Sequence, residues 1–341
     1  MSDQGHAHCQ SDRHEHMHGH THQHAHGAID PVLFTTAQGI RAVQWSLVAL
    51  GVTALFQMVV VFLSGSVALL ADTIHNFGDA ATAIPLWVAF SLARRPPSRR
   101  FSYGYGRVED VAGVIIVLTI LLSGVVAGYQ SVDRLLHPKP IENPWAVVVA
   151  SLLGFVGNEF VAIYRIWVGR RINSVALVAD GYHARTDGLT SLGVLLGAIG
   201  VWLGYPIADP IVGLVITAVI GRIVWDSGKA VFTRLLDGVA PEVIDEIWHA
   251  ALHVRGVKDV TDVRARWLGH QLHAEVNLAV SSDLSVAEGH AIAVEVRHQL
   301  QHDLPYLRSV TIHVDPISHS GEKYHRVQQH MHDGLGLHSH S

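Results

Sequence analysis

The chain has 341 residues, enough for two or three domains, and its composition is 49% hydrophobic and only 16% charged. The formal net charge of −5 argues against a nucleic-acid partner, because a nucleic-acid-binding protein would carry a basic face. The single cysteine, Cys9, excludes a disulfide framework or a thiolate zinc finger within one chain. Any metal site must therefore use carboxylates and some of the 26 histidines.

Two histidine-rich tails flank the rest of the chain. Residues 1–30 contain nine histidines and residues 317–341 contain six more. Neither tail can bury a core, so we expect both to be disordered without metal. Tracts of this kind are typical of metal binding, whereas a purification tag would be an uninterrupted histidine run. No hydrophobic stretch follows Met1, so we expect no signal peptide.

Residues 31–235 predict an all-α membrane domain of six spans. Each of six apolar segments is long enough for the roughly 20 residues that a helix needs to cross hydrocarbon. The segments are Ala42–Leu63, Val67–Leu92, Val111–Leu135, Trp145–Val168, Ser174–Leu203 and Ile207–Phe232. A buried helix of a soluble protein would be shorter and amphipathic. We therefore expect a multi-pass protein in a lipid bilayer.

The basic residues predict how the spans are oriented. Five arginines lie in the connection after the second segment, and Arg170 and Arg171 lie after the fourth, with Arg165 just before them. The opposite side carries only Arg134 and Lys139. Because arginine-rich loops stay in the cytoplasm, both termini and both tails should be cytoplasmic. The expected location is a bacterial cell membrane.

Residues 240–316 are soluble in composition and predict a cytoplasmic α+β domain. The expected helix, two strands, helix and strand are Pro241–His253, Val257–Trp267, Gln271–Val280, Ser285–His302 and Ser309–Val314. Ser285 and Glu288 indicate a capping box at the start of the second helix. The αββαβ order favours helices packed on one face of a small sheet.

One motif occurs twice. Ser66–Thr82 (SVALLADTIHNFGDAAT) and Ser174–Thr190 (SVALVADGYHARTDGLT) agree at nine of 17 positions and share D-x-x-H-x-x-x-D. Three spans separate the copies, so the copies run in opposite directions and predict an inverted 3+3 repeat. Inverted repeats mark many transporters, and the substrate site of these lies near the midplane where the repeats meet.

The spacing of this motif predicts a metal site. The histidine and second aspartate of each copy are four residues apart and share one helix face. The four predicted ligands are His75, Asp79, His183 and Asp187. Zinc takes tetrahedral coordination from such a set. A single buried histidine is more often hydrogen-bonded packing, but ionisable groups at membrane depth are costly and mark functional sites.

Other charged residues near the motif leave alternatives open. Asp72 and Asp180 precede the histidines by three residues. They could gate metal access, cap a helix start or act as direct ligands. Arg185 should point to another helix face than His183. It either pairs with Glu159 in the fourth segment or lowers the metal affinity of the site electrostatically.

The paired motifs, the stretch FSYGYGRVED and the terminal IHVDP resemble the cation diffusion facilitator family of metal/proton antiporters over about residues 30–316. The resemblance implies a homodimer, six spans in each protomer, and a metallochaperone-like cytoplasmic domain. The transport ligands of the family correspond to the four residues predicted above, and the His/Asp, His/Asp combination is similar to zinc-preferring members. Cytoplasmic metal-site candidates are His270, His273, His290, His313 and Asp315. Ordinary exposed histidines are the alternative.

The sequence thus predicts export of a divalent metal, Zn²⁺ first, in exchange for protons. Metal is then the transported substrate, and we expect no cofactor. Cadmium, cobalt, nickel and iron are alternatives, because affinity trends do not separate them from zinc. Two other hypotheses are a channel-like or importing carrier that uses the same site, and a membrane-bound metal sensor or buffer that acts through the tails. No nucleophile–base motif or phosphate loop indicates an enzyme.

Overall fold

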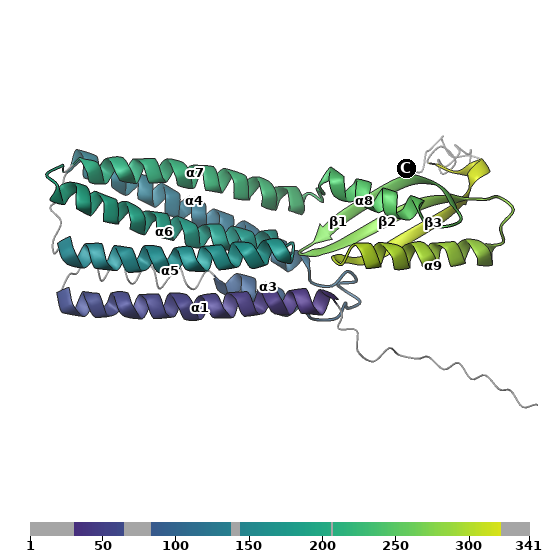
Figure 1. Ribbon diagram of the computed structural model, residues 1–341, viewed down its shortest axis with the longest axis horizontal. Helices are drawn as coiled ribbons and strands as arrows, with labels where there is room; N and C mark the ends of the chain where they lie inside the picture. Colours follow the sequence, from purple (N-terminus) through teal and green to yellow (C-terminus); the bar gives the residue numbers. More distant parts are fainter. Residues whose placement is uncertain (1–30, 65–82, 138–143, 206, 322–341) are drawn as a thin grey trace, which may run out of the picture.

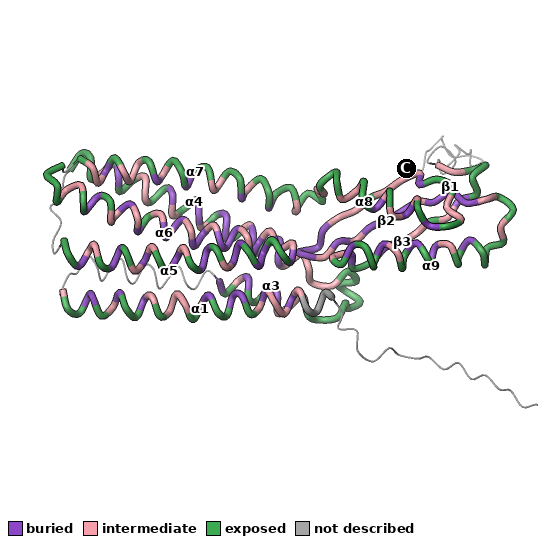
Figure 2. The backbone as a smooth tube through the Cα atoms, viewed as in Figure 1, coloured by how far each residue is buried: buried purple, intermediate pink, exposed green. Residues whose placement is uncertain are grey.

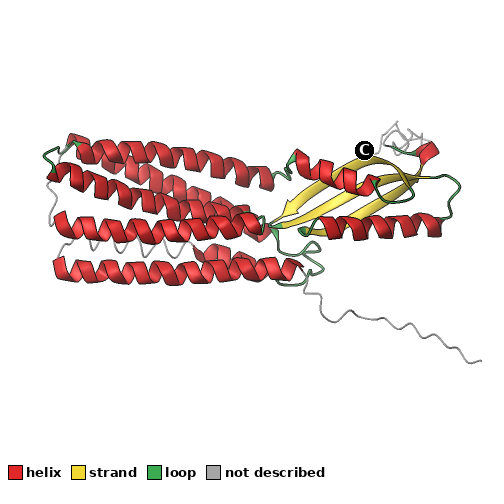
Figure 3. Cartoon of the chain, in the orientation of Figure 1, coloured by secondary structure: helices red, strands yellow, loops and turns green. Residues whose placement is uncertain are grey.

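The computed structural model describes residues 31–64, 83–137, 144–205 and 207–321, with side chains from residue 35 onward. A bundle of long helices is followed by a small sheet domain at one end of the bundle (Figures 1 and 3). The tail of residues 1–30 and all but the start of the tail of residues 317–341 lie outside the described residues.

The helical bundle is apolar on its outside. Its helices are α1 (Pro31–Ser64), α3 (Ala83–Ala93), α4 (Arg107–Leu136), α5 (Pro144–Arg171), α6 (Val175–Trp202) and α7 (Ala208–Leu235). Phe62 on α1 is 81% exposed and Phe160 on α5 is 67% exposed. The outward faces are mostly exposed along the bundle (Figure 2). Exposed apolar side chains over long helices are what a bilayer covers, so this part is a membrane domain.

Four of the described helices are long and apolar enough to cross a membrane: α1 from Thr35, α4, α5 and α7. They correspond to four of the six predicted segments. The segment Val67–Leu92 lies mostly outside the described residues, and α3 is its described end. The fifth segment is α6, whose 28 residues span about 42 Å at the usual rise. It carries Asp180, Arg185 and Asp187 within its first half.

Helix α6 is enclosed by its neighbours. It packs most closely against α5 and also against α7 and α4. Small residues allow the close approach: a Cβ atom on Gly181 would lie 2.6 Å from the side chain of Ile166 on α5. Gly193 packs in the same way against Ile216 on α7. The helix that carries the second motif is therefore inside the bundle.

The C-terminal domain confirms the predicted αββαβ order. Its elements are α8 (Pro241–Leu252), β1 (Val257–Leu268), β2 (Gln271–Val280), α9 (Val286–Asp303) and β3 (Leu307–Pro316), with a short 3₁₀ helix at Ile317–His319. The sheet order is β1-β2-β3; β1 and β2 pair antiparallel, and β2 and β3 pair parallel. The capping box of Ser285 and Glu288 is present at the start of α9.

Alternation along β2 decides which face of the sheet is covered. Leu272, Val276 and Leu278 are fully buried and share a core with Ile247 of α8 and Leu300 of α9. The polar residues that alternate with them along β2 face the other side. The turn between β1 and β2 points at the end of the helical bundle (Figure 1). This turn joins the two parts of the molecule.

Candidate metal centre

The described half of the predicted metal site is on α6. Ser174 caps this helix, because its side chain accepts a hydrogen bond from the Leu177 backbone N–H. The motif then falls within regular helix. His183 and Asp187 lie one turn apart, with 3.8 Å between His183 Nδ1 and Asp187 Oδ1 and side-chain exposures of 1% and 12%. The predicted shared face is therefore present in this copy, at a buried position.

The first copy of the motif cannot be placed. Asp72, His75 and Asp79 lie within residues 65–82, outside the described residues. Within the ranges that the structure covers, no group of three or more His, Cys, Asp or Glu could hold a metal ion. The four-ligand site therefore stays a prediction, of which the structure supplies the geometry of one half.

Asp180 forms a buried ion pair. Its Oδ2 lies 3.0 Å from Nη1 of Arg165 on α5, and the two side chains are 0% and 1% exposed. The capping alternative for Asp180 is wrong, because Ser174 caps the helix. Arg165 lies within α5, before the basic residues Arg170 and Arg171, as its sequence position predicts. An arginine inside the segment Trp145–Val168 was the signal for a buried partner, since such charges need one.

Arg185 pairs with Glu159, as one of the two alternatives predicted. Its Nη2 lies 2.6 Å from Glu159 Oε1, and its Nε lies 3.2 Å from Oε2. This two-point contact links α6 to α5 at partly buried positions. The charge of Arg185 is compensated by Glu159, which favours pairing over a direct electrostatic effect on the metal. Two ion pairs thus fasten α6 to α5 on either side of His183.

The five predicted cytoplasmic ligands do not gather in one place. His313 Nε2 lies 2.9 Å from Asp315 Oδ1, so these two are neighbours on β3 as their spacing predicts. His290 is exposed on α9. His270 is buried at the domain junction, where its ring nitrogens lie at hydrogen-bond distance from Thr36 and Glu109. His273 lies on the open face of the sheet.

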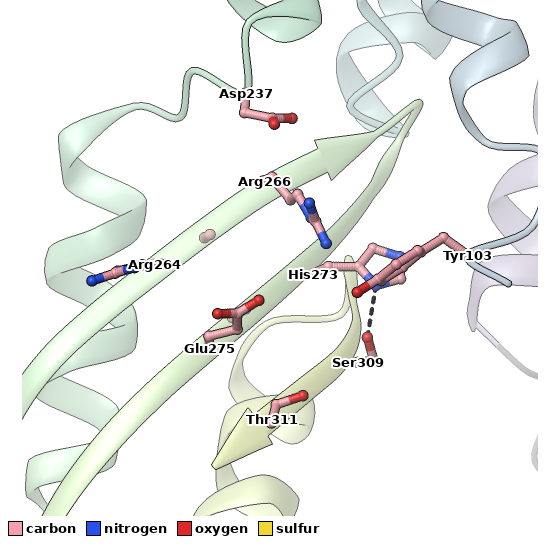
Figure 4. Close-up of a pocket in the computed structure, with 10 residues that line it drawn as sticks. Tyr103, Asp237, Arg264, Arg266, His273, Glu275, Ser309 and Thr311 are labelled. Atoms are coloured by element: carbon pink, nitrogen blue, oxygen red, sulfur yellow. Dashed lines mark hydrogen bonds between the residues drawn. The ribbon is translucent and has the colours of Figure 1, made fainter. Parts of the chain in front are cut away.

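His273 lines a pocket of about 240 Å³ beside the loop that precedes α4 (Figure 4). Its Nδ1 lies 2.7 Å from Ser309 Oγ. The Arg266 guanidinium sits 4.8 Å from the ring centre of Tyr103, which borders the same pocket. Burial, helped by Arg266 and Arg308, lowers the pKa of His273 to about 4. The positive neighbours that disfavour its proton would disfavour a metal cation as well.

Comparison with known proteins identifies two family regions. Residues 43–236 match the family model described as "Cation efflux transmembrane domain". Residues 239–317 match the model described as "Cation efflux protein, cytoplasmic domain". The first match alone covers more than half of the chain, and the boundary between the two follows the end of α7.

Several relatives match over most of their length. A "Probable cation efflux system protein" of Mycobacterium tuberculosis is 53% identical over 292 residues, 86% of this chain and 88% of the relative. Magnetosome protein MamB of Paramagnetospirillum magneticum is 29% identical, over 81% of this chain and 94% of the relative. Manganese efflux system protein MneP of Bacillus subtilis is 28% identical, over 74% and 87%.

A solved structure of the MamM C-terminal domain also matches. It is 24% identical, covers 23% of this chain and 99% of that domain, and has a TM-score of 0.22. The transmembrane family model and the relative at 53% identity are enough to decide the family. The chain belongs to the cation efflux family, known as the cation diffusion facilitators, and is a multi-pass membrane transporter of cations.

Proposed function

We propose that this protein exports a divalent transition metal, Zn²⁺ first, from the cytoplasm in exchange for protons. The observation that carries the proposal is the pair of His183 and Asp187 on α6, whose side chains are 1% and 12% exposed. The same histidine and aspartate recur as His75 and Asp79 in the first copy of the motif. Together the four side chains would supply two imidazoles and two carboxylates to the transported ion.

The donor set supports zinc over manganese. Zinc accepts histidine nitrogen and carboxylate oxygen in a tetrahedral site, whereas manganese suits oxygen ligands. The relative MneP is named for manganese efflux, so family membership alone does not decide the metal. Cadmium, cobalt, nickel and iron have overlapping preferences and belong in the test.

Proton exchange follows from ligand chemistry. A histidine must lose its proton before it can bind metal, so protons and metal compete for the site. Imidazole titrates near physiological pH, which makes His75 and His183 the expected proton carriers. Facing the cytoplasm, the site would release protons and bind metal. Facing a more acidic medium, it would take up protons and release metal.

The arrangement of the chain supports cytoplasmic termini. The first residues of α1, the start of α4 and the sheet domain lie at the same end of the bundle (Figure 1). The arginine-rich connection before α4 is at this end too, where Arg107 pairs with Asp237 after α7. Basic loops remain in the cytoplasm, so this end would face it. The match to the cytoplasmic domain of the family supports a homodimer.

The test is metal-driven proton movement in proteoliposomes that hold a pH-sensitive dye. Zinc, cadmium, cobalt, nickel, iron and manganese are compared for the wild type, His183→Ala, His75→Ala and the control His298→Ala. His298 is exposed on α9. We expect zinc-driven flux to fall to background in both site variants and to persist in the control. A response to another metal but not zinc would change the substrate, and normal flux in His183→Ala would refute the site.

The histidine-rich tails favour a second candidate, a membrane-bound metal sensor or buffer. Nine histidines in residues 1–30 and six in residues 317–341 could hold several ions. Deleting residues 1–30 and 322–341 separates the two functions. A transporter would keep its metal-driven flux with an altered metal dependence, whereas a buffer would lose its metal capacity and show no flux before or after the deletion.

A further inference from the structure

The turn between β1 and β2 ends in a buried histidine that reaches the membrane helices. His270 is 3% exposed. Its Nδ1 lies 2.7 Å from Glu109 Oε2 on α4, and its backbone N–H donates to the same oxygen at 3.3 Å. Its Nε2 lies 3.0 Å from the Thr36 hydroxyl on α1. One side chain of the sheet domain thus contacts two helices of the bundle.

The rest of the turn is seated on α4 and α7. The Gly269 backbone N–H donates to Asp110 Oδ2 at 3.3 Å, and its carbonyl accepts from Arg234 Nη1 at 2.9 Å. The Arg234 guanidinium also lies 4.0 Å from the ring centre of Trp267 on β1. A Cβ atom on Gly106 would lie 2.6 Å from the Leu268 carbonyl oxygen. The turn is therefore held against α4 and α7 by contacts that do not involve His270.

The contact of the turn with α1, in contrast, is made by the His270 side chain. Helix α1 packs mainly against α5 and α3, while α4 packs mainly against α7 and α6. His270 lies between α1 and α4, with its ring 5.8 Å from the ring of Phe90 on α3, a helix that packs against both. Its imidazole joins α1 to α4 through two hydrogen bonds. Since α1 and α4 are not principal packing partners of each other, this bridge is a specific link between them.

The chemistry of the bridge is well defined. An ionised Glu109 carboxylate can only accept, so Nδ1 of His270 must carry the proton. The Thr36 hydroxyl can donate to a neutral Nε2 or accept from a protonated one. Within the described part of the chain, the other oxygen of Glu109, Oε1, is buried without a hydrogen-bond partner. Glu109 therefore depends on His270, and a buried carboxylate that loses its donor is costly.

We propose that His270 is a positioning residue that sets the placement of α1 relative to α4 at the cytoplasmic end of the bundle. This inference rests on the proposed transport function. Alternating access requires one group of helices to move against another around a fixed site. A bridge between α1 and α4 stabilises one relative placement of these two helices over others. His270 would thereby let the sheet domain control the rate of the transport cycle without touching the metal.

Two substitutions at His270 separate its two hydrogen bonds. The amide nitrogen of asparagine falls near the Nδ1 position, so His270→Asn keeps the Glu109 contact and loses that to Thr36. The amide of glutamine falls near Nε2, so His270→Gln does the opposite. Thr36→Val removes the hydroxyl with almost no change in shape, and so removes the α1 contact while His270 and Glu109 stay intact. His298→Asn, at an exposed position on α9, is the matched control.

The first readout is transport in proteoliposomes beside metal binding in detergent. Losing one buried hydrogen bond corresponds to about a tenfold change in an equilibrium. We expect the maximal flux of Thr36→Val and His270→Asn to change by about this factor. The metal Kd should stay at the wild-type value, and the control should match the wild type in both. Equal changes in flux and Kd would indicate a general structural defect and overturn the proposal.

The second readout is amide hydrogen exchange of the turn and of the first turns of α1, which does not need transport. The bridge predicts faster exchange at the start of α1 in Thr36→Val, with the turn still protected by its contacts to α4 and α7. Unchanged exchange and unchanged flux in Thr36→Val and His270→Asn would overturn the proposal. A wild-type protein without flux would refute the transport function, while hydrogen exchange would still decide whether the bridge exists.

Discussion

The buried ion pair of Arg165 and Asp180 gives the clearest prediction about the stability of the protein. Both side chains are almost completely buried, 3.0 Å apart, between α5 and α6. Replacing one partner leaves the other charge buried without a counter-charge. Replacing both leaves no buried charge. We expect Arg165→Leu or Asp180→Leu to destabilise the protein by about 3–5 kcal/mol. The double variant should be less destabilised than the sum of the two.

Thermal unfolding in detergent across this double-mutant cycle measures the effect. The exposed pair of Arg264 and Asp262 on β1 of the sheet domain, at 70% and 40% exposure, is the control, and Arg264→Leu should change stability by less than about 1 kcal/mol. A single variant at Arg165 as stable as this control would contradict the assigned role of the buried pair.

Protonation of His273 should make the stability of the sheet domain depend on pH. Burial, with Arg266 and Arg308, lowers its pKa to about 4 from the usual 6.5. The unfolded chain therefore binds more protons between these values. Stability should be unaffected by His273 above pH 6.5 and should fall as pH drops towards 4. Hydrogen exchange of β2 amides from pH 7 to 4.5 measures this, and His273→Asn should remove that part of the dependence.

The sequence predicted contacts within one helix better than contacts between distant segments. The shared face of His183 and Asp187 follows from their four-residue spacing, and the structure has it. The partner of His270 did not follow, because Glu109 lies 161 residues away and no local pattern encodes that pairing. The family resemblance suggested a metal ligand there. Packing of two domains instead placed the ring beside a carboxylate and a hydroxyl.

At the scale of single elements, the start of α9 tests whether a short sequence motif, the capping box, stabilises a helix. Ser285 accepts from the Glu288 N–H, and the Glu288 side chain accepts from the Ser285 N–H. Ser285→Ala should destabilise the start of α9 by about 1 kcal/mol. Glu288→Gln should preserve the box, since glutamine can replace glutamate there. Hydrogen exchange in the first turn of α9 distinguishes them, and equal exchange in both variants would contradict the capping role.

Elements were predictable where one physical signal dominated. The strands at Val257–Leu268 and Gln271–Val280 follow their alternation and the glycine between them, where Gly269 adopts a φ of 62°. Helix α6 was also predictable in extent, although it is not among the four helices best suited to a bilayer. Its charged residues are accommodated by Arg165 and Glu159 of α5, which only the packed structure brings alongside.

For the whole molecule, the proposed homodimer is the arrangement to test. The sheet domain matches the cytoplasmic domain of a family for which the sequence resemblance implies dimers. Light scattering on detergent-purified protein should give twice the chain mass after subtraction of the detergent. The measurement uses the wild-type chain, in which Arg107 and Asp237 pair at the junction of the two domains. A monomer mass that persists across concentrations would contradict the dimer.

The partnership of α5 and α6 also bears on how the chain enters a membrane during synthesis. A charged residue at the centre of a helix opposes insertion by about 2.5–3.5 kcal/mol, and α6 carries Asp180, Arg185 and Asp187. Two of these are neutralised by arginine–carboxylate pairs with α5. Helix α5 is synthesised before α6, so α5 would remain beside the translocon until α6 has been made, and the two would enter the bilayer together as a hairpin. The two ion pairs on either side of His183 would then also assist the insertion of α6 into the membrane during synthesis.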